Sequence, residues 1–217
     1  MKKDYITVYT EGTGEYIEKK SRFIGTLFHV TSEEEAEARL SEVRKHFYDA
    51  SHHCYAYVLG PDRKLVKCSD QGEPSGTAGQ PILSVLNGEE LTDAMIIVTR
   101  YFGGTLLGTG GLVRSYTKAA REAVSQSTLV HKYPAELLLI RTDYQGLGKL
   151  QYMFSEESLS PTEILYEENV KIKVPVPEER TEEILKKVSD ITNGKAEISK
   201  EREILFGKVG KEILLFG

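Results

Sequence analysis

The side chains best suited to chemistry in this chain lie in two glycine-dense stretches, residues 69–79 and 100–111. The first stretch holds two carboxylates and two hydroxyls, from Asp70, Glu73, Ser75 and Thr77. Carboxylates can serve as general acids or bases, and a serine can be a nucleophile when a base activates it. His52 and His53, on a nearby predicted strand, could supply that base, and His53 is the one that we place at the site. One hypothesis is therefore a small hydrolase-like enzyme that uses this loop.

The same loop has a simpler interpretation, in which Asp, Ser and Thr shape turns by hydrogen bonding to the backbone. A serine nucleophile of the Gly-x-Ser-x-Gly type is not indicated, because Ser75 lies in the sequence Glu-Pro-Ser-Gly-Thr. We therefore favour a non-enzymatic protein and assign no catalytic residue.

The second stretch suggests an anion site. Arg100 ends an apolar segment, the chain then passes through a run of glycines, and a helix is predicted to follow. Free N–H groups at the start of a helix attract anions. The glycines are Gly103, Gly104, Gly108, Gly110 and Gly111. The stretch lacks both the Gly-Lys-Ser/Thr of a phosphate loop and the dinucleotide glycine spacing, so tight turns remain the alternative.

Three basic residues in the predicted helix strengthen the anion hypothesis. Arg114, Lys118 and Arg121 follow one another at four and three residues, which places them on one helical face. The bound phosphate could belong to RNA or to a small molecule, and a solvated basic face is the simpler interpretation. Aromatic residues could add stacking surfaces for bases. The candidates are Tyr48, Tyr55, Tyr57, Tyr101 and Phe102.

We expect neither a metal nor a cofactor. His52, His53, Cys54 and Cys68 are the residue types that bind zinc, but neighbours in a strand point to opposite faces. The two cysteines do not form a Cys-x-x-Cys pair. Such sparse cysteine usage suits a reducing cytoplasm.

Composition argues against several other classes. The chain has 217 residues and a net charge of -5, so no global field draws it to nucleic acid or a membrane. Any nucleic-acid surface must therefore be a local patch. The N-terminus lacks the apolar core of a signal peptide, and no apolar run approaches the ~18 residues of a membrane span. We expect a cytoplasmic protein with no membrane partner.

The pattern of apolar residues predicts the α+β class with two domains, residues 1–131 and 132–217. In the first, one strand with a glycine break at Gly12 and Gly14 spans residues 5–17, and the segment 93–101 is the central strand. The helix 112–124 is expected to turn Val113 inward. Further strands are predicted at 22–30, 54–59 and 64–68, and helices at 31–48 and 81–88. The second domain reads βαββαβ, the split-βαβ pattern, with strands at 134–142, 162–166, 170–176 and 196–206 and helices at 144–154 and 177–191.

At the two glycine-dense stretches the sequence resembles the IMPACT family, including its bacterial YigZ-type members. The matching segments are 70–81, 98–104 and 107–116, and His53 and Ala56 also fit. The family domain would cover about residues 15–125 of this chain. The resemblance implies a first domain with a left-handed βαβ crossover, similar to domain IV of elongation factor G. The second would be a ferredoxin-like domain similar to domain V of that factor.

Both of those domains face ribosomal RNA, so the resemblance implies a role in translation regulation with RNA or the ribosome as partner. Eukaryotic members restrain a starvation-responsive kinase through an additional N-terminal domain, which we do not expect here. The family provides no established catalytic residues. Three hypotheses remain: an RNA- or ribosome-binding regulator, the hydrolase-like enzyme, and a module that binds protein partners of the translation machinery through the sheet of the second domain.

Overall fold

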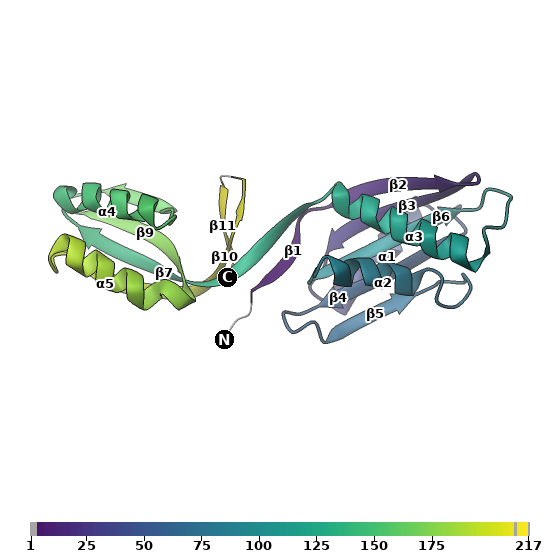
Figure 1. Cartoon of the computed structure of the whole chain (residues 1–217), viewed down its shortest axis with the longest axis horizontal. Helices are drawn as coiled ribbons and strands as arrows, with labels where there is room; N and C mark the ends of the chain where they lie inside the picture. Colours follow the sequence, from purple (N-terminus) through teal and green to yellow (C-terminus); the bar gives the residue numbers. More distant parts are fainter. Residues whose placement is uncertain (1–3, 211, 217) are drawn as a thin grey trace. The chain divides into compact units, whose positions relative to one another are not determined.

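The computed structural model describes residues 4–210 and 212–216, and the N-terminal residues 1–3 lie outside that range. The described residues fall into two compact units, one from Tyr5 to His131 and one from Lys132 onward (Figure 1). Each unit contains both helices and a sheet, so the α+β class is confirmed. The long strand β7 (Thr128–Thr142) contains the boundary.

The N-terminal unit is built on an antiparallel sheet with strand order β2-β3-β6-β4-β5. The sheet consists of β2 (Gly12–Glu18), β3 (Ser21–His29), β4 (His52–Leu59), β5 (Leu65–Ser69) and β6 (Ala94–Tyr101). The first strand of the chain, β1 (Tyr5–Thr10), is not part of it and pairs with β7. The helices of this unit are α1 (Glu33–His46), α2 (Gly79–Gly88) and α3 (Gly108–Ser125). The predicted central strand is indeed central, because β6 pairs with β3 on one side and β4 on the other.

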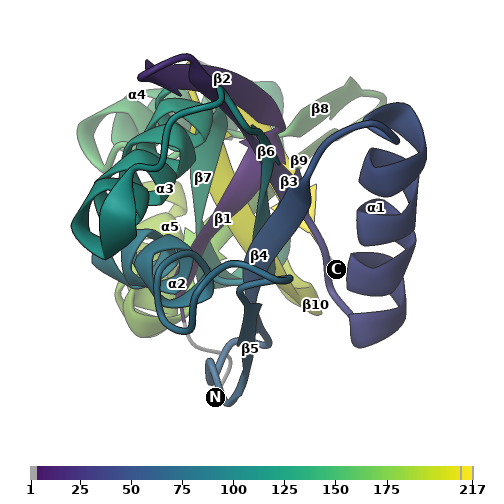
Figure 2. The same cartoon turned by 90° about the vertical axis from the view of Figure 1, so that its right-hand side faces the viewer.

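Helices cover both faces of this sheet. Figure 2 shows α1 on one side of β4 and β6, with α2 and α3 on the other. Ile96 and Val98 belong to the apolar cluster under α2 and α3, whereas Met95 and Ile97 belong to the cluster under α1. Successive strand residues point to opposite faces. Both faces of β6 are therefore buried under apolar side chains, which explains why polar and apolar residues do not alternate in its sequence.

The helix predicted at 31–48 forms α1, which begins at Glu33 with a hydrogen-bonded cap. Ser32 is the N-cap, and its hydroxyl accepts a hydrogen bond from the Glu35 backbone N–H at 3.2 Å. The Glu35 carboxylate in turn accepts from the backbone N–H of Thr31 at 2.7 Å. Acidic residues in the first turn also favour the positive end of the helix dipole.

The predicted strand 5–17 is wrong, because β1 ends at Thr10 and the two glycines lie inside β2 rather than at a break. These glycines allow α3 to pack closely on the sheet. A side chain at Gly14 would run into the backbone of Glu122 in α3, and one at Gly25 in β3 would meet the carbonyl of Ala119. Glycine in a strand commonly marks such a close backbone approach. These positions let α3 lie directly on β2 and β3.

The inward position predicted for Val113 is also wrong, because this side chain is exposed. The helix begins four residues earlier than predicted, at Gly108. The face that α3 buries consists of Leu112, Ser115, Tyr116, Ala119, Ala120 and Ala123. Small residues dominate it, as the close contact with the sheet requires.

The C-terminal unit has the predicted order βαββαβ, followed by one strand that the sequence did not indicate. Its elements are β7, α4 (Tyr144–Glu156), β8 (Glu163–Tyr166), β9 (Val170–Pro177), α5 (Thr181–Thr192), β10 (Glu197–Val209) and β11 (Glu212–Phe216). A short 3-10 turn, Glu178–Arg180, precedes α5. The strand order is β11-β10-β7-β9-β8. The helices α4 and α5 share one apolar cluster with β7 and β9 (Figure 1).

Candidate functional site

The two glycine-rich loops meet at a buried ion pair. Arg100, near the end of β6, donates from Nη1 to Oε1 of Glu73, in the loop between β5 and α2, at 2.5 Å. The two side chains are 6% and 3% exposed. The guanidinium carbon also lies 5.3 Å from the ring centre of Phe23 and 5.7 Å from that of Phe102. The Arg100 side chain therefore makes its contacts inside the domain and is not exposed on the surface.

A chain of buried polar groups continues from this pair. The Tyr116 hydroxyl donates to Oε1 of Glu73 at 2.8 Å. Cys54 Sγ lies 3.3 Å from that hydroxyl and 2.9 Å from the carbonyl oxygen of Asp70. Burial, reinforced by Cys54 and Glu73, raises the pKa of Tyr116 far above its usual range. Burial also raises the pKa of Cys54 to about 12. Both groups therefore stay protonated, and the thiol is not a nucleophile.

His52, rather than His53, is the histidine next to Glu73. Its Nδ1 lies 2.9 Å from the carbonyl oxygen of Gln71, and its Nε2 lies 3.9 Å from Oε1 of Glu73. A carbonyl only accepts, so Nδ1 carries the proton, and in the neutral ring Nε2 is an acceptor.

His53 points to the opposite face of β4, with Nδ1 3.1 Å from the hydroxyl oxygen of Thr99. Burial, with smaller contributions from Arg44 and His52, lowers the pKa of His53. Adjacent strand residues alternate between faces, so the sequence could have excluded His53 as a partner of any group that His52 contacts.

Asp70 organises the first loop through its carboxylate. One oxygen accepts from the backbone N–H of Gly76 at 2.8 Å, and the other accepts from Ala78 at 2.9 Å and Gly79 at 2.8 Å. Burial raises the pKa of Asp70, but these three hydrogen bonds outweigh it, and the net pKa is lowered. Thr77 donates to the Pro74 carbonyl at 2.6 Å. Both side chains act as the turn interpretation predicts.

The hydrolase-like arrangement is not formed. The Asp70 carboxylate is occupied by backbone groups, Glu73 is paired with Arg100, and Ser75 is exposed. His53 lies on the other side of the sheet from the Glu73 side chain. A serine mechanism needs the base within hydrogen-bond reach of the hydroxyl, and these four residues do not converge.

The second loop separates the predicted anion residues into a buried group and an exposed group. Gly103 lies against the Lys20–Ser21 backbone, and its N–H donates to the Ser21 hydroxyl at 3.1 Å. Gly104 is exposed, and Gly108, Gly110 and Gly111 form the start of α3. No side chain of the described residues caps this helix start. Arg114, Lys118 and Arg121 are exposed on α3, apart from Arg100.

A cavity of about 520 Å³, which we call the loop cavity, opens between the two loops. Its polar groups come from His52, Glu73 and Arg100. Its walls are largely apolar side chains. The full lining is Ser51, His52, Glu73, Pro74, Arg100, Phe102, Leu106, Leu107, Gly108, Thr109 and Leu112. Sequence reasoning singled out neither Phe102 nor Leu106 as part of a cavity, although their position in a glycine-rich loop was visible.

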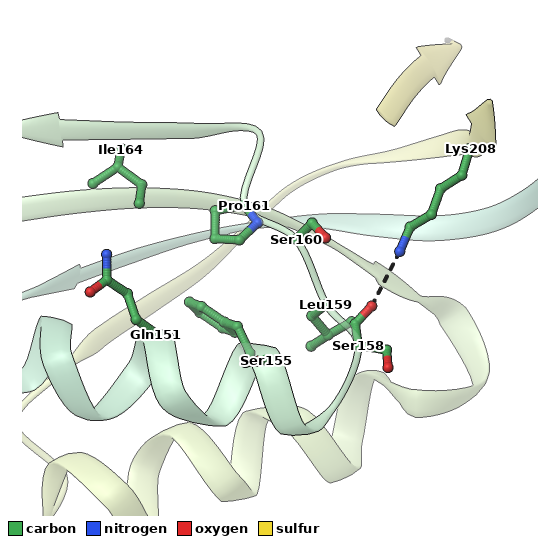
Figure 3. Close-up of a pocket in the computed structure, with 9 residues that line it drawn as sticks. Gln151, Ser155, Ser158, Leu159, Ser160, Pro161, Ile164 and Lys208 are labelled. Carbon is green, nitrogen blue, oxygen red and sulfur yellow. Dashed lines mark hydrogen bonds between the residues drawn. The ribbon is translucent and has the colours of Figure 1, made fainter. Parts of the chain in front are cut away.

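The C-terminal unit has a cavity of its own, of about 480 Å³, beside the end of α4 (Figure 3). Serine hydroxyls from Ser155, Ser158 and Ser160 line it, together with Gln151 and Lys208. The Lys208 ammonium already donates to the Ser158 carbonyl at 3.3 Å, as Figure 3 shows. Within residues 4–210 and 212–216, no cluster of three or more His, Cys, Asp and Glu side chains is arranged to hold a metal. Nor does any helix in that part of the chain have the length and apolarity to span a membrane.

Comparison with known proteins gives two family matches. Residues 19–124 match the model of the Impact N-terminal domain, and residues 140–195 match a domain of unknown function, DUF1949. A Bacillus subtilis protein named IMPACT family member YvyE is 39% identical over 206 residues, which is 95% of this chain and 94% of the relative. The Escherichia coli protein named IMPACT family member YigZ is 35% identical over 182 residues, 83% of this chain and 89% of the relative. A crystal structure described as that of a hypothetical protein has a TM-score of 0.60 and 32% identity, covering 93% of this chain and 99% of that one.

Proposed function

The chain belongs to the IMPACT family, and we propose that it is a non-enzymatic regulator of translation that binds RNA or the ribosome through the exposed face of α3. Its partners in this proposal are RNA and proteins of the translation machinery, and its location is the cytoplasm. The proposal rests on the arrangement of charge on α3 and on the adjoining turns.

The observation that carries the proposal is a line of exposed cations on α3 that form no direct ion pair among the described residues, although the Tyr16 hydroxyl that Lys118 contacts donates to the Glu18 carboxylate at 2.8 Å. Among the described residues, no carboxylate pairs with Arg114 or Arg121, and Lys118 donates only to the Tyr16 hydroxyl, at 3.1 Å. The three side chains follow one face of the helix, and Glu122 is the single acidic residue within α3. Cations held ready in this way suit phosphate contacts, which supply most of the non-specific affinity for nucleic acid.

Neighbouring acidic side chains are engaged elsewhere. Glu15 on β2 pairs with Arg22 at 2.7 Å, and Glu11 pairs with Arg39 at 3.0 Å. At the β2–β3 turn, Lys19 and Lys20 are exposed, and the backbone of Lys20 lies against Gly103. This turn therefore adds two further cations beside the second glycine-rich loop.

Aromatic rings accompany these cations. The Lys118 ammonium lies 4.6 Å from the ring centre of Tyr16, and Phe102 is 50% exposed beside the loop cavity. Single-stranded nucleic acid binds to surfaces that combine a basic track with rings on which bases stack. Tyr55 and Tyr57 do not contribute, because they are buried under α1.

The finer parts of the proposal concern the fold. We assign to the N-terminal unit a likeness to domain IV of elongation factor G, including a left-handed β3-α1-β4 crossover, and to the C-terminal unit a ferredoxin-like likeness to domain V. The parallel course of β3 and β4 on either side of β6 supports the first assignment. The strand order β10-β7-β9-β8 supports the second.

Binding to fluorescently labelled single-stranded RNA over a range of salt concentrations tests the proposal. We expect the double variant R114A/R121A to bind more weakly. Because each phosphate contact to a single strand contributes a slope of about -0.7, the magnitude of the slope of log K against log salt should fall by about 1.4. The matched control, R44A/K45A, removes two exposed cations from α1, on the opposite face of the sheet, and should leave the slope unchanged.

Co-sedimentation with ribosomes, with and without nuclease, separates RNA from protein partners. Loss of the associated material after nuclease supports the RNA proposal. Partners that persist would favour the protein-interaction module instead. An intact chain that binds neither RNA at low salt nor ribosomes contradicts the proposal.

A further inference from the structure

We propose that the loop cavity receives a single unstacked nucleobase that carries an exocyclic amino group, as adenine, cytosine and guanine do. The source of that base in RNA rests on the function proposed above. The chemistry of recognition stands on the cavity itself, and free nucleosides can test it separately.

The walls of the loop cavity suit a flat heterocycle. Phe102 and Leu106 are 50% and 85% exposed, so large apolar surfaces stand at the mouth with little protein over them. Leu107, Leu112 and Pro74 continue the apolar wall. The volume of about 520 Å³ lies within the ordinary range of small-ligand sites, about 300–1,000 Å³. A base lying against the Phe102 ring would cover both the ring and the apolar wall.

Two polar groups of the cavity, His52 and Glu73, offer acceptors, and these select the edge of the base. His52 holds a proton on Nδ1, and in the neutral form of the ring Nε2, 3.9 Å from Oε1 of Glu73, is an acceptor. The two atoms are too far apart for a hydrogen bond. The second carboxylate oxygen of Glu73 receives no hydrogen bond from the described residues. An amino group has two N–H donors and can give one to the imidazole and one to the carboxylate.

Arg100 and Tyr116 are positioning residues for this carboxylate. Both donate to Oε1, which fixes the orientation of Glu73 and leaves the other oxygen for a ligand. The Nε–H of Arg100 is buried and has no acceptor among the described residues. A buried donor left without a partner is uncommon in folded proteins and calls for a functional explanation.

The same acceptors exclude bases that lack the amino group. Uracil and hypoxanthine carry a carbonyl oxygen at the position where cytosine and adenine carry the amino group. That oxygen would face the Nε2 lone pair and the carboxylate, with no hydrogen to share. Buried polar groups that lose their partner discriminate strongly between otherwise similar ligands.

The cavity also adjoins the basic face of α3. Gly108 and Thr109 line the cavity and begin the helix, whose first-turn N–H groups have no partner within the helix, and Arg114 follows on the exposed side. A phosphate attached to the bound nucleoside would therefore lie near the positive end of an 18-residue helix. The loop cavity is therefore next to the exposed face of α3 that we propose binds RNA.

The test compares nucleosides that differ only at the amino group. The intact chain is titrated with cytidine against uridine and with adenosine against inosine, and binding is followed by the ¹⁵N resonance of the His52 imidazole Nε2. We expect cytidine and adenosine to bind at least about tenfold more tightly than their partners, which corresponds to one lost hydrogen-bonded contact of about 1.4 kcal/mol. Equal affinity within both pairs would overturn the proposal.

Two variants show whether the cavity is the site. Leu106→Ala changes a side chain that is 85% exposed, so the fold should not be affected, and nucleoside affinity should fall at least threefold. Its matched control is Leu65→Ala, an exposed leucine on β5 outside the cavity, which should bind as the parent does. Glu73→Gln should remove the preference for cytidine over uridine, provided that its circular dichroism spectrum matches that of the parent.

The two proposals can fail separately. RNA binding that depends on salt but not on the amino group would leave the RNA proposal standing and overturn the base site. Selective nucleoside binding without RNA binding would support the base site and contradict the RNA proposal. A chain that binds no nucleoside at millimolar concentration overturns the base site whatever the RNA result.

Discussion

Arg100 and Glu73 form an ion pair with 2.5 Å between Nη1 and Oε1, and both side chains are almost completely excluded from water. The pair joins the first glycine-rich loop to the central strand of the N-terminal sheet. Two residues that the sequence assigned to different hypotheses, an anion site and a catalytic loop, therefore neutralise each other. Their mutual dependence gives the first prediction.

Arg100→Met should lower the free energy of unfolding of the N-terminal unit by about 3–5 kcal/mol, because it leaves the Glu73 carboxylate buried without its cation. Urea unfolding followed by circular dichroism measures the change. The double variant R100M/E73Q removes both charges and should recover part of the loss. A single variant as stable as the parent would show that the pair does not stabilise the loop.

The sequence predicted the local role of several single residues in this site, but it did not predict which residues contact one another. Alternation along β4 already separated His52 from His53, and glycine next to Asp, Ser and Thr already indicated a hydrogen-bonded loop. The pairing of Arg100 with Glu73 could not be predicted from the sequence, because these residues are 27 apart in the chain. They meet only when α3 packs on the sheet. The glycines of β2 were misread for the same reason, since their role depends on α3, far along the chain.

The second prediction concerns that packing. Gly25→Ala should destabilise the N-terminal unit by roughly 2 kcal/mol or more, because the added methyl group meets the Ala119 backbone carbonyl and α3 must shift. Gly110→Ala is the matched control. It lies within α3, where the added carbon makes only an ordinary contact, and it should stabilise by about 0.5–1 kcal/mol through helix propensity. Thermal unfolding of the parent and the two variants measures both changes in stability. Equal effects at both glycines would refute the packing argument.

The third prediction concerns Asp70. Asp70→Asn keeps the shape of the side chain but loses the charge that three backbone N–H groups stabilise, so it should cost about 1–3 kcal/mol at neutral pH. The pKa of Asp70 is lowered in the folded state from its usual 3.8. Its stabilising contribution is therefore complete above pH 3.8 and is lost as the pH falls through the lower, folded pKa.

Urea unfolding of parent and variant across the acid range should show the two stabilities converge at low pH. Asp62→Asn, a change at an exposed carboxylate in the β4–β5 turn, is the control and should leave the acid profile unaltered. A difference between parent and D70N that is constant with pH would mean that the charge of Asp70 contributes nothing.

The last prediction concerns His53. Burial, together with the positive charge of Arg44 and the neighbouring His52, lowers the pKa of His53 in the folded protein from 6.5. As the pH falls below 6.5, the unfolded chain takes up a proton at this position before the folded chain does. Stability should therefore decrease with falling pH through 6.5 and continue to decrease until the folded pKa is passed.

The ¹⁵N resonances of His53 should titrate with a midpoint below 6.5, and His53→Gln should flatten the dependence of unfolding free energy on pH in that window. His46→Gln, at an exposed position in the last turn of α1, should keep the slope of the parent. A His53 midpoint at or above 6.5 would be inconsistent with a half-buried ring under the influence of the Arg44 charge, since burial and a nearby cation both disfavour the protonated form.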